Sequence, residues 1–254
     1  MQPSSAAPAV RRYPYRVTRI IDATHDVRRV WLDAAGPAPF VFEAGQFASV
    51  RFGSLPARDY SMASRPDEAT LEFHVRRVGR DGASAYVARE LKRGDDVAVE
   101  GPFGDAWLRR DHRGPSIAIA GGSGLAPIKS IVETALALGM AQSVALYFGV
   151  RDEPDLYLEE HFTALAERHR NFRFIPVLSE PKGWTRRRTG LVGDAVAEDI
   201  ASARGYKAYL AGPPPMVESA SAMLKARGLR DDDLHADPFY TEAEMVARGK
   251  RPRS

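Results

Sequence analysis

Hydrophobic residues follow two different patterns along this chain. Up to about residue 110 they form short runs rich in β-branched and aromatic residues, separated by glycine and proline turns. Runs of this kind are typical of strands in an antiparallel barrel or sandwich. We predict strands at residues 15–21, 27–32, 47–52, 59–63, 70–76 and 96–100.

One helix interrupts these strands, at residues 84–91. Gly79 and Gly82 precede it, and we expect the Ser84 hydroxyl to cap its first turn. Unpaired N–H groups and the helix dipole favour an anion there. The segment therefore fits either a phosphate site or a plain capped helix after a glycine turn.

Beyond residue 115 strand and helix patterns alternate. We predict strands at residues 116–120, 143–150, 172–178 and 207–211, and helices at 128–136, 158–170, 193–203 and 214–227. Such alternation indicates a parallel sheet covered on both faces. The predicted fold class is an N-terminal six-stranded antiparallel β-barrel followed by a five-stranded parallel α/β nucleotide-binding domain.

A glycine-rich turn, residues 121–127, joins the first strand and helix of the second half. Its Gly-x-Gly-x-x-Pro spacing lets backbone approach a pyrophosphate, and Pro127 suits a first helical turn. Tight packing would also explain glycines here. Segments 149–152 and 211–216 fall at the same edge of the sheet, which favours a binding crevice.

The strand around Arg58, Tyr60 and Ser61 carries a second candidate site. We expect these side chains to offer a cation, a flat ring and a hydroxyl to one ligand from one face of the strand. That set suits a ligand with phosphates and a planar ring system, although such a strand can also be ordinary surface.

Composition narrows the chemistry. The 254 residues contain no cysteine, which excludes disulfides, a catalytic thiol and an all-cysteine iron–sulfur cluster within them. The six histidines lack metal-ligand spacing, so no metal site is predicted. The net charge of +3 does not call for nucleic acid. With no long apolar run and no leader pattern, we expect a cytoplasmic protein without membrane insertion.

The order of these motifs resembles the ferredoxin–NADP reductase superfamily, most closely the flavin/NADH reductase components of bacterial multicomponent oxygenases, without an iron–sulfur domain. The matching segments are 58–61, 82–84, 101–104, 121–127, 147–151, 212–216 and 235–239. The resemblance implies an FAD-binding barrel (residues 14–110) and an NAD(P)H-binding domain (111–240). A disordered tail (1–13) and a basic tail (241–254) flank them in this scheme.

The same resemblance implies hydride transfer from NAD(P)H to FAD. Tyr60 would stack on the flavin ring, Ser61 would lie near flavin N5, and Phe239 would cover the other flavin face; these are the predicted catalytic residues. The predicted cofactor-binding residues are Arg58, Tyr60, Ser61, His74, Val75, Arg76, Gly82, Ala83, Ser84, Gly122, Gly124, Pro127, Arg151, Glu180, Gly212, Pro213, Met216 and Phe239.

The resemblance and the sequence around Glu180 lead to expectations about the flavin, the nucleotide and the electron acceptor. FAD is expected over FMN. NADH is favoured over NADPH because the carboxylate of Glu180 would repel a 2′-phosphate, although Arg186, Arg187 and Arg188 lie nearby. That arginine run fits either a solvated loop or, together with Arg76, Arg77 and Arg80, a docking surface for an acidic ferredoxin.

Three functions stay open on the sequence. The first is an NADH-dependent flavoprotein reductase that passes single electrons to a separate ferredoxin or oxygenase component. The second is a reductase of free flavin or another diffusible acceptor. The third is a non-catalytic flavin- or nucleotide-binding module.

Overall fold

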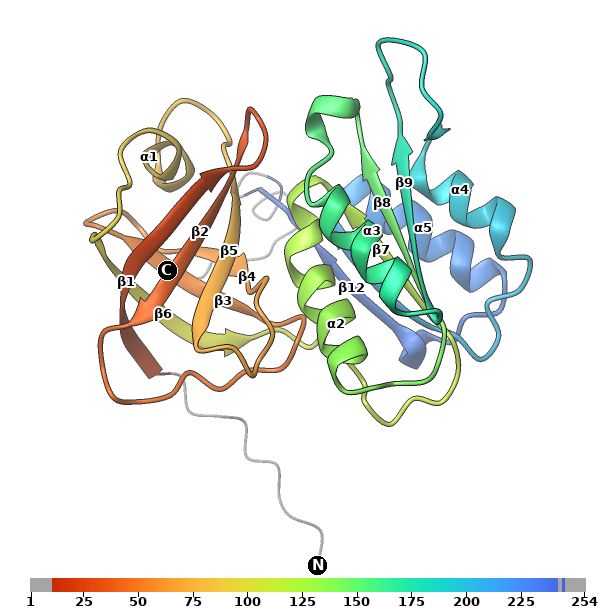
Figure 1. Cartoon of the computed structure of the whole chain (residues 1–254), viewed down its shortest axis with the longest axis horizontal. Coiled ribbons are helices and arrows are strands. Elements are labelled where there is room, and N and C mark those ends of the chain that lie inside the picture. The colour runs from red at the N-terminus through yellow and green to blue at the C-terminus, as the bar shows by residue number, and fades with distance from the viewer. Residues whose placement is uncertain (1–10, 242–243, 245–254) are drawn as a thin grey trace, which may run out of the picture.

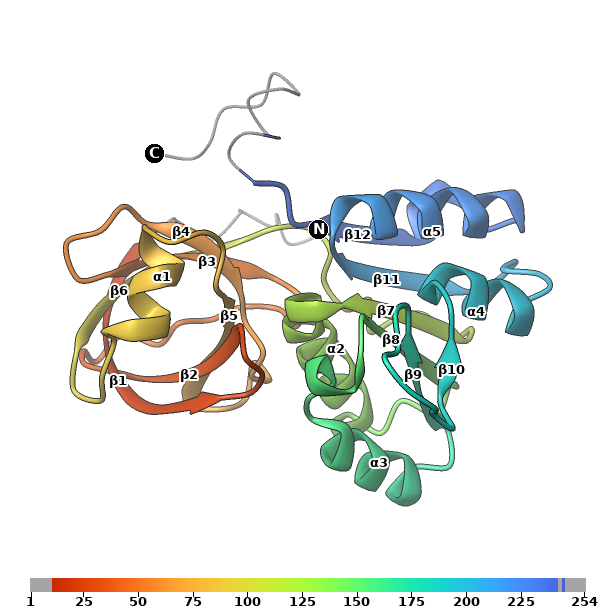
Figure 2. The ribbon, with the colours of Figure 1, turned by 90° about the horizontal axis from the view of Figure 1, so that it is seen from above.

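The chain folds into a barrel and an α/β domain that pack side by side (Figures 1 and 2). The computed structural model describes residues 11–241 and 244. Residues 11–13, which we assigned to the tail, belong to the first strand. Residues 1–10 and most of the predicted basic tail lie outside the described residues.

The barrel is an antiparallel sheet in the order β4-β3-β6-β1-β2-β5. Its strands are β1 (Arg11–Asp22), β2 (Val27–Ala34), β3 (Phe47–Phe52), β4 (Arg58–Ser61), β5 (Thr70–Arg76) and β6 (Asp96–Phe103). An isolated bridge between Met62 and Phe73 joins the chain after β4 to β5, so the sheet is nearly closed. All six predicted strands are present.

Strand alternation builds the barrel core. Every second residue of β3 is buried, and the cluster inside the barrel includes Val50, Phe52, Leu71, Phe73 and Val75. Because strand side chains have a period of two, the residues between these point outward. On β5 the outward residues are polar, and two of them are nevertheless buried, which requires a second domain to cover them.

The helix between β5 and β6 is α1 (Ala83–Arg89). Gly82 occupies the cap position, and no side chain caps this helix. Our expectation for Ser84 was wrong: its hydroxyl accepts from the Val78 N–H (3.1 Å) and donates to the Val78 carbonyl (3.2 Å). Ser84 lies one residue inside the helix, so its hydroxyl closes the preceding turn instead.

The second domain is a parallel sheet in the order β10-β9-β8-β7-β11-β12. Its strands are β7 (Ser116–Gly121), β8 (Val144–Val150), β9 (Phe172–Leu178), β10 (Arg188–Thr189), β11 (Lys207–Gly212) and β12 (Leu234–Pro238). We predicted five strands and gave ranges for four of them, whereas the described residues form six. β10 has only two residues, and β12 is half-buried at the sheet edge, so neither shows a strong apolar pattern.

Helices cover both faces of this sheet (Figure 2). They are α2 (Leu125–Ala137), α3 (Glu159–Arg168), α4 (Val192–Asp199) and α5 (Pro214–Ala226), with short 3₁₀ turns η1 (Gly122–Gly124), η2 (Glu153–Asp155) and η3 (Asp231–Asp233). Alternate residues of β7 enter separate cores: Ala118 packs with α2 and α3, and Ile119 packs with α4 and α5. Among the described residues, no helix has the length and apolar character needed to cross a membrane.

Helix α2 faces the barrel as well as its own sheet. A Cβ at Gly45 would lie 2.8 Å from Ile131 Cδ1, so the barrel backbone approaches this helix closely. Ser130 Oγ donates to the Ser64 carbonyl (2.7 Å), and Lys129 Nζ donates to the Ala63 carbonyl (3.1 Å). The two domains are therefore joined along one face of α2.

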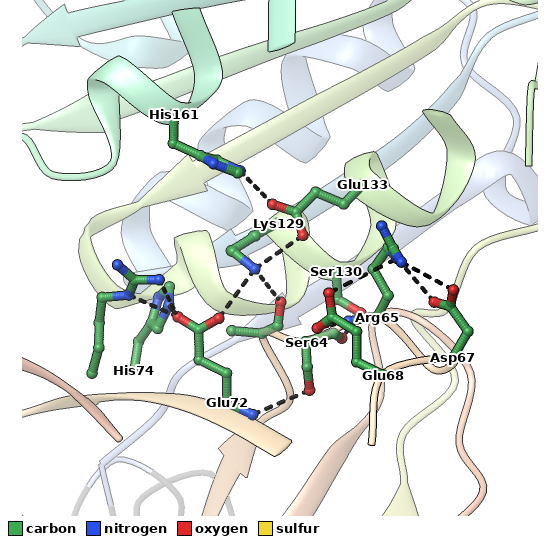
Figure 3. A network of polar contacts seen from close by, with 12 residues as sticks. Ser64, Arg65, Asp67, Glu68, Glu72, His74, Lys129, Ser130, Glu133 and His161 are labelled. Atoms are coloured by element: carbon green, nitrogen blue, oxygen red, sulfur yellow. Dashed lines mark hydrogen bonds and ion pairs between the residues drawn. The ribbon is translucent and has the colours of Figure 1, made fainter. Parts of the chain in front are cut away.

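Lys129 is also the centre of a buried charge network between the domains (Figure 3). Its ammonium lies 3.1 Å from Glu72 of β5 and 3.0 Å from Glu133 of α2. Arg29 of β2 approaches Glu72 at 2.7 Å, and His161 of α3 bonds Glu133. Burial of an unpaired charge is costly, so each of these groups requires the others.

Candidate functional site

Two glycine turns meet at the carboxyl edge of the parallel sheet. A Cβ at Gly124 would lie 2.2 Å from the Ala211 carbonyl oxygen, and one at Gly121 would lie 2.6 Å from Met216 Sδ. Gly212 has φ +137° and would place a Cβ 2.7 Å from the Gly121 carbonyl oxygen. Only glycine fits such approaches, so the β7–α2 and β11–α5 turns form one closely packed surface.

The third predicted turn lies beside the first two. Gly149 is paired with Gly121 across β8 and β7, and the chain continues to Arg151. The backbone N–H of Glu180 donates to the Arg151 carbonyl (2.7 Å), which places the segment after β9 at the same edge. The prediction that these turns converge is confirmed.

Gly122 lies close to the barrel strand β5. Its backbone is left-handed, with φ +53°, and Arg76 Nη1 would be 3.8 Å from a Cβ placed there. Arg76 Nε donates to Asp26 Oδ2 at 2.9 Å. A cation and a glycine loop thus face each other across the domain boundary, an arrangement suited to a phosphate group.

The strand β4 places its predicted residues on different faces. Tyr60 is half-buried and packs edge-on against Phe52 of the barrel core at 5.9 Å between ring centroids. Ser61 is buried and reaches the second domain. Our expectation of one shared face was wrong, because Tyr60 and Ser61 are adjacent and strand side chains alternate. Arg58 shares the parity of Tyr60, and its Nη1 donates to the Ala57 carbonyl.

Ser61 meets an acidic residue that we did not predict as part of the site. Its hydroxyl donates to Asp237 Oδ2 at 3.4 Å, from barrel to β12. Burial raises the pKa of Asp237 to about 6, and the Ser61 hydroxyl opposes that rise in part. The signal available in the sequence was the position of Asp237 two residues before Phe239.

Phe239 directly follows the last residue of β12. Its N–H donates to the Gly212 carbonyl at 2.9 Å, and its side chain packs on the core beneath α2. Gly212 therefore lies next to the residue predicted to cover the flavin, and Pro213 and Met216 pack against Gly121. The C-terminal segment, the glycine turns and Ser61 meet in one region.

The predicted residues of β5 also separate by parity. Val75 is buried in the barrel core, so any contact it makes with a ligand is through backbone. The side chains of His74 and Arg76 point outward: His74 bonds Glu72 and Tyr157, and Arg76 faces Gly122. Gly82, Ala83 and Ser84 lie at the start of α1, where Gly82 has φ +86° and open space around it.

A histidine and two carboxylates bring the β1–β2 turn next to η2. His25, Asp26 and Asp155 place ligand atoms within 4.8 Å of one another. Asp26 is paired with Arg76, and Asp155 is paired with Arg151, which also lies 4.0 Å from Asp26. Hydrogen bonds from Arg76 and Thr24 outweigh burial and hold the pKa of Asp26 below its usual value. The two arginines neutralise this group.

The arginine run after β9 is largely engaged in ion pairs. Arg187 bonds Glu153 and Glu159, and Arg188 bonds Glu198 and Asp199. These pairs anchor the loop between β9 and β10 to the second domain. The Arg186 guanidinium lies over the exposed Trp184 ring at 5.6 Å.

A cavity of about 540 Å³ lies under this loop, at the outer edge of the sheet. Its lining includes Phe174, Pro176, Trp184 and Arg186. The sheet order places β9 and β10 on the far side of β7 and β8 from β12, which carries Asp237. The cavity is therefore separate from the region around Ser61.

The fold and the site define a two-domain flavin and nucleotide oxidoreductase. The sequence matches the oxidoreductase FAD-binding domain family over residues 14–107 and the oxidoreductase NAD-binding domain family over residues 118–222. These matches fall on the barrel and on the α/β domain respectively.

Proteins similar in sequence or structure to this chain belong to the same class of oxidoreductase. The chain is 43% identical over 224 residues to a Ralstonia sp. reductase component of naphthalene 1,2-dioxygenase/salicylate 5-hydroxylase systems, covering 88% of this chain and 68% of that protein. It is 30% identical to an NAD(P)H-flavin reductase of Aliivibrio fischeri, covering 79% and 88%. The crystal structure of Amycolatopsis cytochrome P450 reductase GcoB superposes with a TM-score of 0.84 at 39% identity, covering 92% and 71%. The chain belongs to the FAD- and NAD-binding oxidoreductases of the ferredoxin–NADP reductase superfamily.

We predict that Asp237→Asn stabilises the protein above pH 6 and has little effect near pH 4. The carboxyl ionises near 3.8 when unfolded and near 6 when folded, so folding takes up a proton between these values and stability falls as pH rises. The amide does not ionise and avoids this loss. We expect a Tm several degrees above wild type at pH 8, measured by differential scanning fluorimetry at pH 4 and pH 8.

The matched control is Asp232→Asn, at an exposed position in η3. It should leave the Tm unchanged at both pH values. Equal Tm values for Asp237→Asn and wild type at pH 8 would show that burial does not raise the pKa of Asp237.

Proposed function

We propose that this protein is an NADH-dependent reductase that transfers hydride to bound FAD and then passes single electrons to a separate iron–sulfur protein. The observation that carries the proposal is the contact of Ser61 with Asp237. It joins the strand of the candidate flavin site to the segment beside the candidate nucleotide turns. A flavin bound at the barrel and a nucleotide bound at the glycine turns would therefore meet at the boundary between the two domains.

The residues present fit an FAD and a pyridine nucleotide. In this proposal Arg58 pairs with flavin phosphate, Tyr60 stacks on the flavin ring, and Ser61 lies beside N5. His74 and Val75 contribute backbone, and Gly82, Ala83 and Ser84 hold the flavin pyrophosphate. The nucleotide is held by Arg76, Gly122, Gly124, Pro127, Arg151, Gly212, Pro213 and Met216.

FAD supplies the redox chemistry when bound, because it accepts a hydride and can release electrons singly. The protein supplies position and charge. Ser61 and Asp237 can hold or exchange a proton at the flavin edge, since a carboxyl with a pKa of about 6 is poised near neutral pH. In this proposal Phe239 would cover the flavin face to which the nicotinamide binds, and the nucleotide would displace it.

The preference for NADH rests on Glu180. It is exposed beside the Arg151 backbone, where its carboxylate would repel a 2′-phosphate and accept from ribose hydroxyls. Arg187 and Arg188 are each paired with carboxylates of their own domain. Their charges are therefore less available to attract the 2′-phosphate of NADPH. Because the same two arginines are paired, they also offer little free positive charge to an acidic ferredoxin.

The acceptor is inferred from relatives. A Ralstonia relative is named as the ferredoxin–NAD(P)+ reductase component of oxygenase systems, and one of Amycolatopsis as an aromatic O-demethylase reductase subunit. These 254 residues contain no cysteine, so an all-cysteine iron–sulfur cluster that receives the electrons must lie outside them. A separate ferredoxin or oxygenase component is the acceptor we favour.

Reduction of free flavin is the second candidate. The observation that favours it is the similarity to the Aliivibrio fischeri NAD(P)H-flavin reductase, of which this chain covers 88%. In that case the flavin would be a diffusible substrate and would dissociate during turnover.

Anaerobic addition of NADH to the purified yellow protein tests the function. We expect the flavin absorbance near 450 nm to bleach with one equivalent of NADH per flavin. Mass spectrometry of the released cofactor should identify FAD. Turnover is then compared with a ferredoxin, free FMN and free FAD as acceptors. Fast reduction of the ferredoxin alone supports the first candidate, and fast reduction of free flavin supports the second. If NADH bleaches neither bound nor added flavin, both candidates are refuted.

We predict that Arg58→Ala yields largely flavin-free protein. The substitution removes a charge-assisted hydrogen bond to phosphate, which should weaken FAD binding about ten- to hundredfold. The ratio of absorbance at 450 and 280 nm measures occupancy. Arg16→Ala, at an exposed position of β1 paired with Asp96, should keep its flavin. Full occupancy in Arg58→Ala would remove this assignment.

We predict that Glu180→Arg raises kcat/KM for NADPH relative to NADH by about tenfold, because an attraction to the 2′-phosphate replaces a repulsion. Steady-state kinetics with both nucleotides measure the ratio. Glu160→Arg makes the same charge change at an exposed position of α3 and should leave the ratio unchanged. Equal ratios in both variants would show that residue 180 does not read the 2′ group.

A further inference from the structure

The turn between β1 and β2 reaches the second domain beside the glycine turns. His25 Nδ1 lies 3.4 Å from Asp155 Oδ1 of η2, and Asp26 Oδ2 lies 4.0 Å from Arg151 Nη2. Within the barrel, Asp26 Oδ2 accepts a hydrogen bond from Arg76 Nε at 2.9 Å. Asp26 therefore contacts one arginine of each domain.

The turn holds the Asp26 carboxylate in place. Thr24 Oγ1 donates its one proton to Asp26 Oδ1 at 2.9 Å, and it accepts from the N–H groups of Asp26 and Val27 at 3.2 and 2.9 Å. Burial alone would raise the pKa of Asp26, but the hydrogen bonds from Arg76 and Thr24 outweigh burial and lower this pKa. The carboxylate is therefore ionised at neutral pH, and a separate donor holds each of its oxygens.

Arg76 uses only part of its guanidinium on this carboxylate. Its Nε is bonded to Asp26, whereas its Nη1 and Nη2 make no hydrogen bond to any residue in the described part of the chain. Nη1 would lie 3.8 Å from a Cβ at Gly122. Because a guanidinium is planar, the bond at Nε also sets the direction of the N–H groups on Nη1 and Nη2. The bond to Asp26 therefore holds the free end of Arg76 beside the glycine turn.

Arg151, the other arginine at this edge, is bound differently. Its Nε and Nη2 both donate to Asp155, at 3.1 and 3.4 Å, so one carboxylate occupies a whole side of the guanidinium. Two-point pairing of this kind is typical of strong arginine–carboxylate pairs. Of the two arginines, Arg76 keeps more of its donors available to an anion.

Without Asp26, the Arg76 side chain would lose the contact that orders it. Its guanidinium is bonded to no other group among the residues that the structure describes, and the neighbouring carboxylate of Asp155 already pairs with Arg151. A long side chain with many rotamers must be ordered when an anion binds to it, which weakens binding. A guanidinium that is already held in place avoids this loss.

We propose that Asp26, braced by Thr24, is a positioning residue that holds the free Nη groups of Arg76 at the Gly122 turn for the pyrophosphate of NADH. The inference rests on the proposed function, because it takes Arg76 and the glycine turns as the nucleotide site. Asp26 is negatively charged, so its removal should by charge alone tighten the binding of a phosphate. Positioning requires the opposite result, and the sign of the effect separates the two.

ADP-ribose is a suitable probe, because it carries the pyrophosphate but no nicotinamide to compete with Phe239. We expect Asp26→Ala to keep its FAD and to bind ADP-ribose about tenfold more weakly than wild type in isothermal titration calorimetry. Asp22→Ala is the matched control. Asp22 accepts from Arg28 Nε at 2.7 Å in the strands that flank the same turn, and its removal should leave the affinity unchanged.

The kinetics of flavin reduction give a second measurement. In anaerobic stopped-flow over a range of NADH concentrations, Asp26→Ala should need about tenfold more NADH for its half-maximal rate. The rate at saturating NADH should stay within about twofold of wild type, because only nucleotide binding is weakened. Damage to the packing of the domains would lower the saturating rate or the flavin content instead.

Two further variants test the route of the effect. Thr24→Val removes the hydroxyl that braces Asp26 and leaves the charge unchanged, so it should also weaken the binding of ADP-ribose. Arg76→Ala should weaken this binding as well, and the addition of Asp26→Ala to Arg76→Ala should weaken it no further. An effect that acts through Arg151 would persist in the double variant.

The inference is wrong if Asp26→Ala or Thr24→Val binds ADP-ribose as tightly as wild type or more tightly. It is also wrong if Asp26→Ala loses its FAD, if Asp22→Ala weakens binding equally, or if the effects of Asp26→Ala and Arg76→Ala multiply. If wild type neither binds ADP-ribose nor bleaches with NADH, the proposed function fails instead, so the two failures are distinguishable.

Discussion

The ion pair between Glu72 and Lys129 is the interaction on which the arrangement of the two domains depends. It is buried, and each partner is satisfied by further groups, since Lys129 also reaches Glu133 and the Ala63 carbonyl. Removal of one member of a buried pair typically costs about 3–5 kcal/mol, because the other charge is left without compensation. The network therefore favours one docking geometry over others that apolar contact alone would allow.

Strand β5 connects this interaction to the candidate site. Its inward residues complete the barrel core, and its outward residues, Glu72, His74 and Arg76, face the second domain. A single strand thus links the barrel core, the domain contact and the glycine turn. The register of its pairing with β2 determines which β5 residues face the barrel core and which face the second domain.

Much of this fold could be predicted from local patterns in the sequence. The barrel strands, the parallel sheet and the converging glycine turns followed from period, turn residues and spacing. The strands β10 and β12 did not, because one has two residues and the other lies half-buried at an edge, with His235 stacked on Tyr209. The charge network could not be predicted either: Lys129 is 57 residues from Glu72, and each resembles an ordinary surface charge until the domains are docked.

The contact along α2 also has a consequence for how such proteins can be recombined. A barrel from a relative with an apolar side chain in place of Glu72 would bury Lys129 against no carboxylate of that domain. Glu133 would then be its only remaining acidic partner of those described here. Exchange of domains between relatives should therefore succeed only when complementary charges are exchanged together. The barrel and the α/β domain of this protein are therefore matched to each other by buried charge as well as by shape.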